Sequence, residues 1–300
     1  MTFSAPFHNL YFYNLIMGIM KLAVDSFSYH LHFGKHWFVP SKQYDLQWYC
    51  GLCKNLKLDG LHIDPMHIDI SKDIGWLKEF SEENNLYIEL GAMGINYADL
   101  DKPLEAARYL GSKVLRTFVG GSCDEGREAT KIKAERAKQE LLRSLENAEK
   151  MGVVIALENH ADLYSDDIKR ILEIDSPFLG LCYDAGNFFS IGEDPLEAVK
   201  MFAEKIVCTH LKDVLPPETY PDAQTFGSGN YKTHFCALGD GKMPLKDIMN
   251  VIRKSKGEDF NITLEIHTPH RKSLSEDELL AFEIENVIKS VHYAKNILAV

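Results

Sequence analysis

The stretch Val153-Val-Ile-Ala-Leu-Glu158-Asn159-His160 has the pattern of a buried β-strand that ends in polar side chains. Its five apolar residues suit a strand covered on both faces, as in a parallel sheet that lies between helices. Three similar runs follow along the chain, and each is closed by Glu, Asp or His: 179–184, 206–213 and 262–267. A short apolar run that ends in a titratable side chain is therefore a repeated feature of this sequence.

Strand-like and helix-like segments alternate along the chain. The predicted strands are 21–26, 60–64, 86–91, 113–119, 153–158, 179–184, 206–210 and 262–265. The predicted helices are 44–56, 74–80, 103–110, 129–151, 166–173, 195–205, 244–254 and 276–298. This alternation implies parallel strands with right-handed crossovers, and eight such units favour an α/β fold of the (β/α)8 TIM barrel type. A doubly wound open sheet is the alternative, but it would usually carry a Gly-rich phosphate turn after its first strand, and none is present here.

The length of 300 residues allows one barrel domain. We expect residues 20–300 to form a single catalytic barrel domain and residues 1–19 to form an N-terminal extension. The segment 7–20 is fairly apolar, but polar residues interrupt it and no basic segment precedes it. It is too short to span a bilayer and lacks the features of a secretory signal, and the rest of the sequence contains no transmembrane run.

Composition narrows the function classes further. The formal net charge of −11 argues against a nucleic-acid or anionic-membrane partner, which would require clustered Lys and Arg. Six scattered cysteines indicate a reducing, cytoplasmic setting without a disulfide framework. The pair Cys50 and Cys53 has redox-motif spacing, but it lies on a predicted helix, where a packing role is favoured.

The carboxyl ends of barrel strands meet on one face, where the active site of this fold lies. We therefore expect the strand-end residues Glu158, Asp184, His210 and Glu265 to be neighbours in space. Three crowded carboxylates repel one another, and a divalent cation would remove that repulsion. A ligand set of oxygens with one nitrogen suits Mn²⁺ best, while Mg²⁺, Co²⁺ and Zn²⁺ are possible.

The same residues carry a family resemblance that covers roughly residue 21 to the C-terminus. The matching pieces are Leu157-Glu158-Asn159-His160, Asp184-Ala-Gly-Asn187, His210-Leu-Lys212-Asp213, Leu238-Gly-Asp-Gly241-Lys-Met-Pro244 and Leu264-Glu265. In their order and spacing they resemble the xylose-isomerase-like barrels, the sugar isomerase and epimerase group that also includes endonuclease-IV-type repair enzymes. The resemblance implies one metal ion at positions 158, 184, 210 and 265, and acid/base roles for the two Glu residues.

This sequence departs from the ketose 3-epimerases of that group at Asn187, where several carry a His, and in the loop 216–234. The resemblance also implies a homo-oligomer, or a barrel that needs a second kind of subunit. We accordingly predict a divalent-metal-dependent sugar isomerase or epimerase that acts on a ketose or keto-sugar. A metal bound to the carbonyl would acidify the neighbouring C–H, and Glu158 and Glu265 would remove and return the proton.

Other strand-end residues are weaker candidates. His160 is either an additional general acid or base or a hydrogen-bonding neighbour of the site. The predicted substrate-binding residues are His62, Glu89, Asn187, Lys212, Asp213 and Arg271. Arg116 is expected to balance the barrel carboxylates rather than to bind substrate.

Three alternatives remain open at this stage. The first is a keto-sugar dehydratase or lyase, including one that cleaves 3-keto-glycosides or C-glycosides, because the same proton abstraction can be followed by β-elimination. The second is an apurinic endonuclease, which would require further metal ligands and a basic rim. The third is a sugar-binding barrel without activity, which would bind metal but show no turnover.

Overall fold

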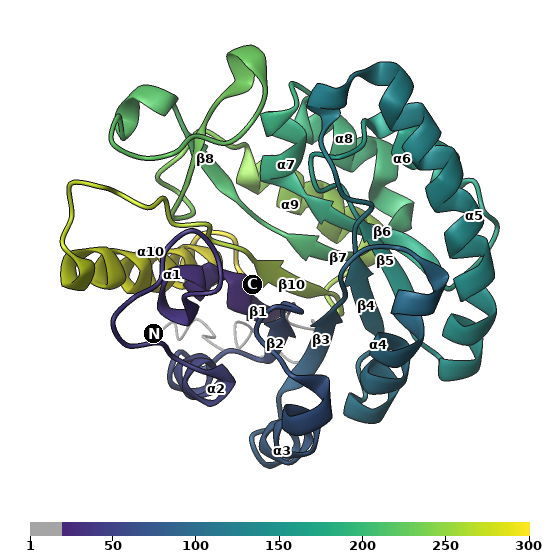
Figure 1. The fold of residues 1–300 in the computed structure, drawn as a ribbon, viewed down its shortest axis with the longest axis horizontal. Helices are drawn as coiled ribbons and strands as arrows, with labels where there is room; N and C mark the ends of the chain where they lie inside the picture. The colour runs from purple at the N-terminus through teal and green to yellow at the C-terminus, as the bar shows by residue number, and fades with distance from the viewer. Residues whose placement is uncertain (1–19) are drawn as a thin grey trace, which may run out of the picture.

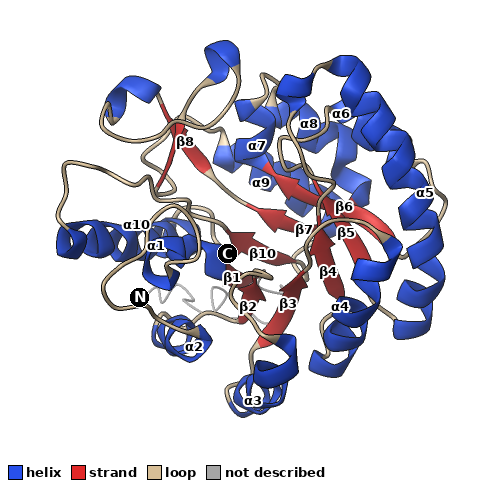
Figure 2. Cartoon of the chain, viewed as in Figure 1, coloured by secondary structure: helices blue, strands red, loops and turns tan. Residues whose placement is uncertain are grey.

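Eight parallel strands close into a barrel in the computed structural model, which describes residues 20–300 (Figure 2). The strands are β1 (Lys21–Asp25), β2 (Gly60–Ile63), β3 (Tyr87–Gly91), β4 (Val114–Thr117), β5 (Val154–Glu158), β6 (Leu179–Asp184), β7 (Ile206–His210) and β10 (Asn261–Leu264). Their order is β10-β1-β2-β3-β4-β5-β6-β7. A parallel bridge between Leu211 and Leu264 joins the two outer strands. The predicted TIM barrel is confirmed, while the expected extension 1–19 lies outside the described residues.

Helices surround the strands (Figure 1). They are α1 (His30–Phe33), α2 (Leu46–Asn55), α3 (Ile70–Glu83), α4 (Tyr97–Leu110), α5 (Arg127–Met151), α6 (Ser165–Leu172), α7 (Ala185–Ser190), α8 (Pro195–Phe202), α9 (Leu245–Lys256) and α10 (Glu276–Asn296). Their buried apolar residues pack on the outer side of the strands and form one continuous core. Within residues 20–300, none of the helices combines the length and hydrophobicity that crossing a membrane would take.

Helix α4 begins six residues before Pro103, where the sequence suggested that it would start. The first turn is held by α5, because the Tyr97 backbone N–H donates to the Glu140 carboxylate at 2.9 Å. Asn147 of α5 also donates to the Asp101 carboxylate at 2.7 Å. These contacts with a neighbouring helix compensate for the hydrogen bond that a proline inside a helix cannot make.

A short helix after β6 and a hairpin after β7 were not predicted from the sequence, and neither was α1 after β1. Asp184 ends β6 and also caps α7, since its carboxylate accepts the Asn187 backbone N–H at 2.9 Å. The long segment after β7 contains an antiparallel hairpin, formed by β8 (Asp213–Leu215) and β9 (His234–Cys236). In Figure 1 strand β8 of this hairpin lies outside the eight barrel strands, next to α7.

The interior of the barrel holds two layers of side chains. The lower layer contains the small apolar residues Val114, Ala156, Cys182 and Cys208. Because side chains alternate along a strand, the residues two positions further on form the next layer. In that layer these are Arg116, Glu158, Asp184 and His210, and each of the other four strands also carries a buried titratable side chain at or near its end: Asp25, His62, Glu89 and Glu265. The barrel interior is therefore apolar at the small residues named first and polar at the ends of the strands.

All six cysteines are buried and free. Cys50 and Cys53 lie on α2 within the core, as the helical pattern suggested. Burial raises the pKa of the Cys53 thiol to about 12, so this thiol is a poor nucleophile. The CxxC spacing reflects helix packing in this structure.

Candidate active site

Glu158, Asp184, His210 and Glu265 converge inside the barrel mouth. One possible ligand atom of each residue lies within 4.8 Å of the others, and all four side chains are buried. The pairing of β6 with β7 shifts register between Leu181 and Cys182, which sets Asp184 directly opposite His210. An irregularity in the sheet therefore helps to bring the two residues to the same level.

His210 is the centre of this group. Its Nδ1 lies 2.6 Å from Glu265 Oε2 and 3.4 Å from Glu158 Oε1. Its Nε2 faces Asp25 Oδ2 at 3.3 Å. Burial acts to lower the pKa of His210, but the neighbouring Cys182, Glu265 and Glu158 raise it well above its ordinary value.

Lys212 brings a positive charge to two of the four residues. Its Nζ lies 2.7 Å from Asp184 Oδ2 and 2.8 Å from Glu265 Oε1. Burial acts to lower the pKa of Lys212, but these carboxylates raise it above its ordinary value. The side chain is thus held as an ammonium, which donates hydrogen bonds and does not act as a Schiff-base nucleophile.

Arg116 balances the opposite side of the group, as the sequence suggested. Its Nε lies 2.6 Å from Glu158 Oε2, and its Nη1 lies 3.7 Å from Asp64 Oδ2. Burial acts to raise the pKa of Glu158, but the guanidinium and His210 hold it below its ordinary value. Glu158 is therefore ionised and fixed in orientation.

Asp184 is oriented by two asparagines. The Asn187 side chain donates to Asp184 Oδ2 at 2.8 Å and to Glu158 Oε1 at 3.3 Å. The Asn159 side chain bonds both the backbone N–H and the carbonyl of Asp184, each at 2.8 Å. Burial raises the pKa of Asp184 to about 7 against the opposing charge of Lys212. A further positive charge at this position would favour the carboxylate.

The residues present fit a divalent cation. Glu158 Oε2 and Glu265 Oε2 have ion-pair neighbours at 2.6 Å, Arg116 Nε and His210 Nδ1, but neither oxygen and neither ring nitrogen of His210 makes a hydrogen bond of good geometry. The eight buried titratable side chains at the strand ends include five carboxyl groups, and the permanently charged Arg116 and Lys212 contact three of these carboxyl groups. A set of carboxylate oxygens and one imidazole nitrogen suits Mn²⁺, Mg²⁺, Co²⁺ or Zn²⁺. The group is therefore a cluster able to bind a metal.

A cavity of about 350 Å³ opens above the four residues. Glu265 borders it together with Asn187 and Lys212, whereas Glu158, Asp184 and His210 lie behind its lining. Aromatic side chains form much of the wall: Phe27, Trp37, Phe118, Phe226 and Phe235. A polar floor beneath an apolar wall is the usual composition of a small-molecule site.

Comparison with known proteins agrees with this geometry. Residues 95–289 match the sequence profile of the xylose isomerase-like TIM barrel family. The chain belongs to that family. In barrels of this kind the active site is expected at the carboxyl ends of the strands, which is where these four residues converge.

Curated relatives in this family are enzymes of several reaction types. A 3-oxo-isoapionate decarboxylase from Pectobacterium atrosepticum is 26% identical over 202 residues, which cover 67% of this chain and 68% of the relative. An inosose dehydratase from Clostridium perfringens is 24% identical over 155 residues, 49% of either chain. The matched region thus spans about half the length of that dehydratase.

Solved structures of the family share the fold. The IOLI protein with a bound zinc atom has a TM-score of 0.65 at 18% identity and covers 91% of this chain and 98% of its own. D-psicose 3-epimerase from Clostridium cellulolyticum H10, solved with D-tagatose, has a TM-score of 0.68 at 13% identity, covering 94% and 100%. At these identities the likeness establishes the architecture.

The other predicted site residues of this family member divide between the cavity and its surroundings. His160 borders the cavity, and its ring stacks on Phe118 with centroids 4.2 Å apart. Burial among its neighbours lowers the pKa of His160, although its outer edge stays open to the cavity. His62 lies behind the lining, where it contacts Glu89 at 3.2 Å and Asp25 at 3.5 Å. His62 and Glu89 are thus placed to support His210 through Asp25, without contact with the cavity.

Asp213 and Arg271 lie outside the cavity lining. The Asp213 carboxylate accepts backbone N–H groups of Gly239 at 2.9 Å, Gly241 at 3.1 Å and Met243 at 3.0 Å. Arg271 forms an ion pair with Asp222 at 2.6 Å, and Asp222 belongs to the segment between β8 and β9. Both residues stabilise the long segment after β7 in this structure.

Asp213→Ala is expected to destabilise the protein by about 2–3 kcal/mol, because the backbone N–H groups of four residues lose a charged acceptor: Val214, Gly239, Gly241 and Met243. Guanidinium unfolding followed by circular dichroism would measure this change. Asp213→Asn keeps one acceptor oxygen and should lose about half as much. Equal stability of Asp213→Ala and the parent would contradict the anchoring role.

Several residues of the site were not singled out from the sequence. Asp25 ends β1 and Asp64 follows β2, so the strand-end rule that identified Glu158 applies to them as well. Trp37, Phe226 and Phe235 line the cavity from connecting segments and the hairpin. Their positions depend on how these segments fold over the barrel mouth, and no local pattern in the sequence encodes that.

Proposed function

We propose that the protein is a divalent-metal-dependent sugar epimerase or isomerase that removes a proton next to the carbonyl of a ketose or keto-sugar. The observation that carries this proposal is the convergence of Glu158, Asp184 and His210 with Glu265, which borders the cavity. Two proteins with a similar fold support this proposal: one is named as D-psicose 3-epimerase, and the other is the IOLI protein, solved with a bound zinc atom. We propose Mn²⁺ first as the metal, with Mg²⁺, Co²⁺ or Zn²⁺ as substitutes.

The four convergent residues would hold the cation, which would supply Lewis-acid polarisation of a substrate carbonyl. Glu265 borders the cavity and is the residue best placed to take a proton from the carbon beside that carbonyl. In the two-base form of the reaction Glu158 returns a proton on the other face. Lys212 and Asn187, which also border the cavity, would hold substrate oxygens, while the aromatic wall would exclude water.

A second candidate is β-elimination from a keto-sugar, by a dehydratase or lyase. It is favoured by the position of Glu158, which lies behind the cavity lining and is paired with Arg116 at 2.6 Å. This arrangement leaves Glu265 as the base and His160, which borders the cavity, as a hydrogen-bond donor to the leaving group. The inosose dehydratase and decarboxylase relatives are consistent with such chemistry.

A deuterium-exchange experiment tests the proposal and separates the two candidates. The protein would be incubated in D₂O with free ketoses, inososes and 3-keto-glycosides, and products would be followed by NMR and mass spectrometry. Epimerisation gives a stereoisomer that carries one deuterium, whereas elimination gives an unsaturated product and a released water or aglycone. Absence of both exchange and turnover across the panel, with metal bound, would overturn the proposal.

Addition of Mn²⁺ is expected to stabilise the fold. At a concentration one hundred times the dissociation constant, a cation that binds only the folded state contributes about 2.7 kcal/mol. The midpoint of thermal unfolding in a chelator-treated sample should therefore rise by several degrees, as measured by differential scanning fluorimetry. The rise should be smaller in Glu265→Gln, which loses one ligand oxygen, and an identical rise in both proteins would contradict the assigned ligands.

A further inference from the structure

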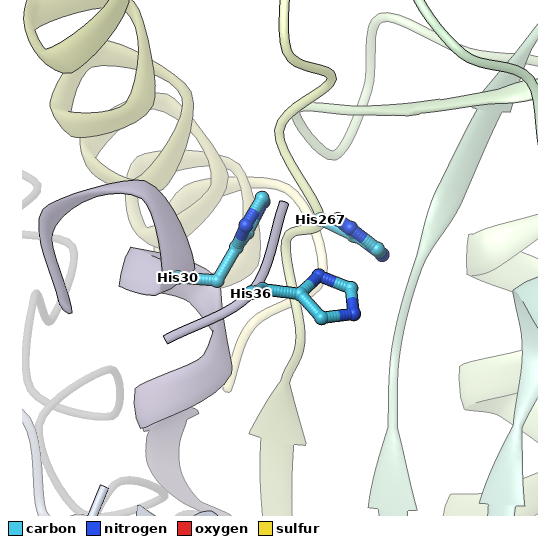
Figure 3. A group of neighbouring side chains, drawn as sticks. All are labelled: His30, His36 and His267. Carbon is cyan, nitrogen blue, oxygen red and sulfur yellow. The ribbon is translucent and has the colours of Figure 1, made fainter. Parts of the chain in front are cut away.

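Three histidines meet at the rim of the cavity, apart from the carboxylate group. His30 belongs to α1, His36 to the segment that follows it, and His267 to the segment after β10 (Figure 3). A possible ligand nitrogen of each ring lies within 4.8 Å of the other two. Segments that are distant along the chain therefore bring three imidazoles together.

Each of these rings has a buried nitrogen without a hydrogen-bond partner. The atoms are His30 Nδ1, His36 Nδ1 and His267 Nε2. The His30 side chain is 1% exposed and that of His267 is 6% exposed, so bulk water does not reach these two nitrogens freely. Buried polar atoms normally find partners, and an unpaired nitrogen on each of three neighbouring rings indicates that a partner binds among these rings.

The surroundings fix the rings in a form that suits a metal. His30 Nε2 lies 3.0 Å from the Thr268 carbonyl, which can only accept a hydrogen bond. The proton of His30 is therefore on Nε2, and Nδ1 presents its lone pair to the cluster. Phe27 stacks on His30 at 5.2 Å, and Trp37 stacks on His267 at 5.1 Å. The orientation of His30 matches the arrangement that holds metal-ligating histidines in other proteins.

The imidazoles are also in the charge state that metal binding requires. Burial lowers the pKa of His30 to about 3 and lowers the pKa of His36 as well. Both rings are neutral at neutral pH, so no proton has to be displaced before a cation binds.

We propose that His30, His36 and His267 form a second metal site, which takes a nitrogen-preferring divalent cation such as Zn²⁺. Three imidazole ligands are typical of zinc sites that keep a further position open, whereas the carboxylate group below is oxygen-rich and suits Mn²⁺ or Mg²⁺. Because His36 and His267 line the cavity, the open position of this cation faces the same space as Glu265. The two sites differ in ligand chemistry and are expected to select different metals.

Zinc binding tests this inference without any measurement of turnover, so the result does not depend on which reaction the protein catalyses. Chelator-treated protein would be loaded with excess Mn²⁺ and titrated with Zn²⁺ by calorimetry, and bound metals would be counted after gel filtration. The parent protein should bind one Zn²⁺ while it retains one Mn²⁺. His36→Ala should weaken the zinc site at least tenfold and leave Mn²⁺ binding unchanged, and circular dichroism would verify its fold. The matched control is His292→Ala, which removes an exposed histidine of α10 and should bind both metals like the parent.

X-ray absorption at the zinc edge of the parent protein provides a test without any variant. Three imidazole ligands are expected in the sample that also holds Mn²⁺. A zinc ion with mainly oxygen ligands, or zinc that enters only as Mn²⁺ leaves, would overturn the inference. Equal zinc affinity in His36→Ala and the parent would overturn it as well, and the three rings would then be packed imidazoles only.

Discussion

Glu265→Gln is expected to lower turnover by about 10³-fold and to stop exchange of solvent deuterium into the substrate. Glu265 is the one of the four convergent residues that borders the cavity, and a positioned general base contributes roughly 10²–10⁴-fold to rate. The amide has the same shape but cannot take a proton. Lys212 keeps its contact with Asp184 at 2.7 Å, so the fold should survive the substitution. Initial rates and NMR exchange in D₂O would measure the effect.

The matched control for this variant is Glu149→Gln, which makes the same chemical change at an exposed position of α5. It should leave turnover and exchange at the level of the parent. Metal content must be measured in both variants, since Glu265 is also a proposed ligand. A Glu265→Gln protein that retains exchange within tenfold of the parent would remove Glu265 from the role of base.

Arg116→Met is expected to destabilise the fold by about 3–5 kcal/mol, since removal of one partner leaves a buried charge uncompensated. The guanidinium is 3% exposed and faces Glu158 at 2.6 Å and Asp64 at 3.7 Å. Methionine fills a similar volume, so the loss would come from the charge rather than from a cavity. Burial raises the pKa of Asp64 to about 6 even with the guanidinium present, which shows how much positive charge this position requires. Guanidinium unfolding at pH 7 would measure the change.

Two further measurements test whether the lost stability of Arg116→Met comes from an uncompensated charge. The double variant Arg116→Met, Glu158→Gln should recover part of the lost stability, because the buried carboxylate is removed together with its partner. Saturating Mn²⁺ should stabilise Arg116→Met at least as much as the parent, since the cation binds beside the same carboxylates. If Arg116→Met were as stable as the parent at neutral pH, the proposed balance of charges inside the barrel would be wrong.

The sequence by itself determined the architecture and the identity of the four convergent residues. Alternation of apolar strands with amphipathic helices specifies parallel crossovers, and these close into a barrel. Glu158, Asp184, His210 and Glu265 could be found because parallel strands deliver their last residues to one face. Arg116 could be interpreted for the same reason, as a cation among strand-end carboxylates.

Tertiary structure decided which of these side chains meet the cavity. Glu265 and His160 border it, while Glu158 lies behind its lining against Arg116, a difference that strand periodicity does not encode. The aromatic wall and the cluster of His30, His36 and His267 come from connecting segments. The position of a strand end follows from the periodicity of apolar residues within that strand and from its pairing with the next strand. The periodicity can be recognised in a short stretch of sequence. The positions of connecting segments depend on packing between residues more than two hundred positions apart, such as His30 and Thr268, and only the folded chain brings these together.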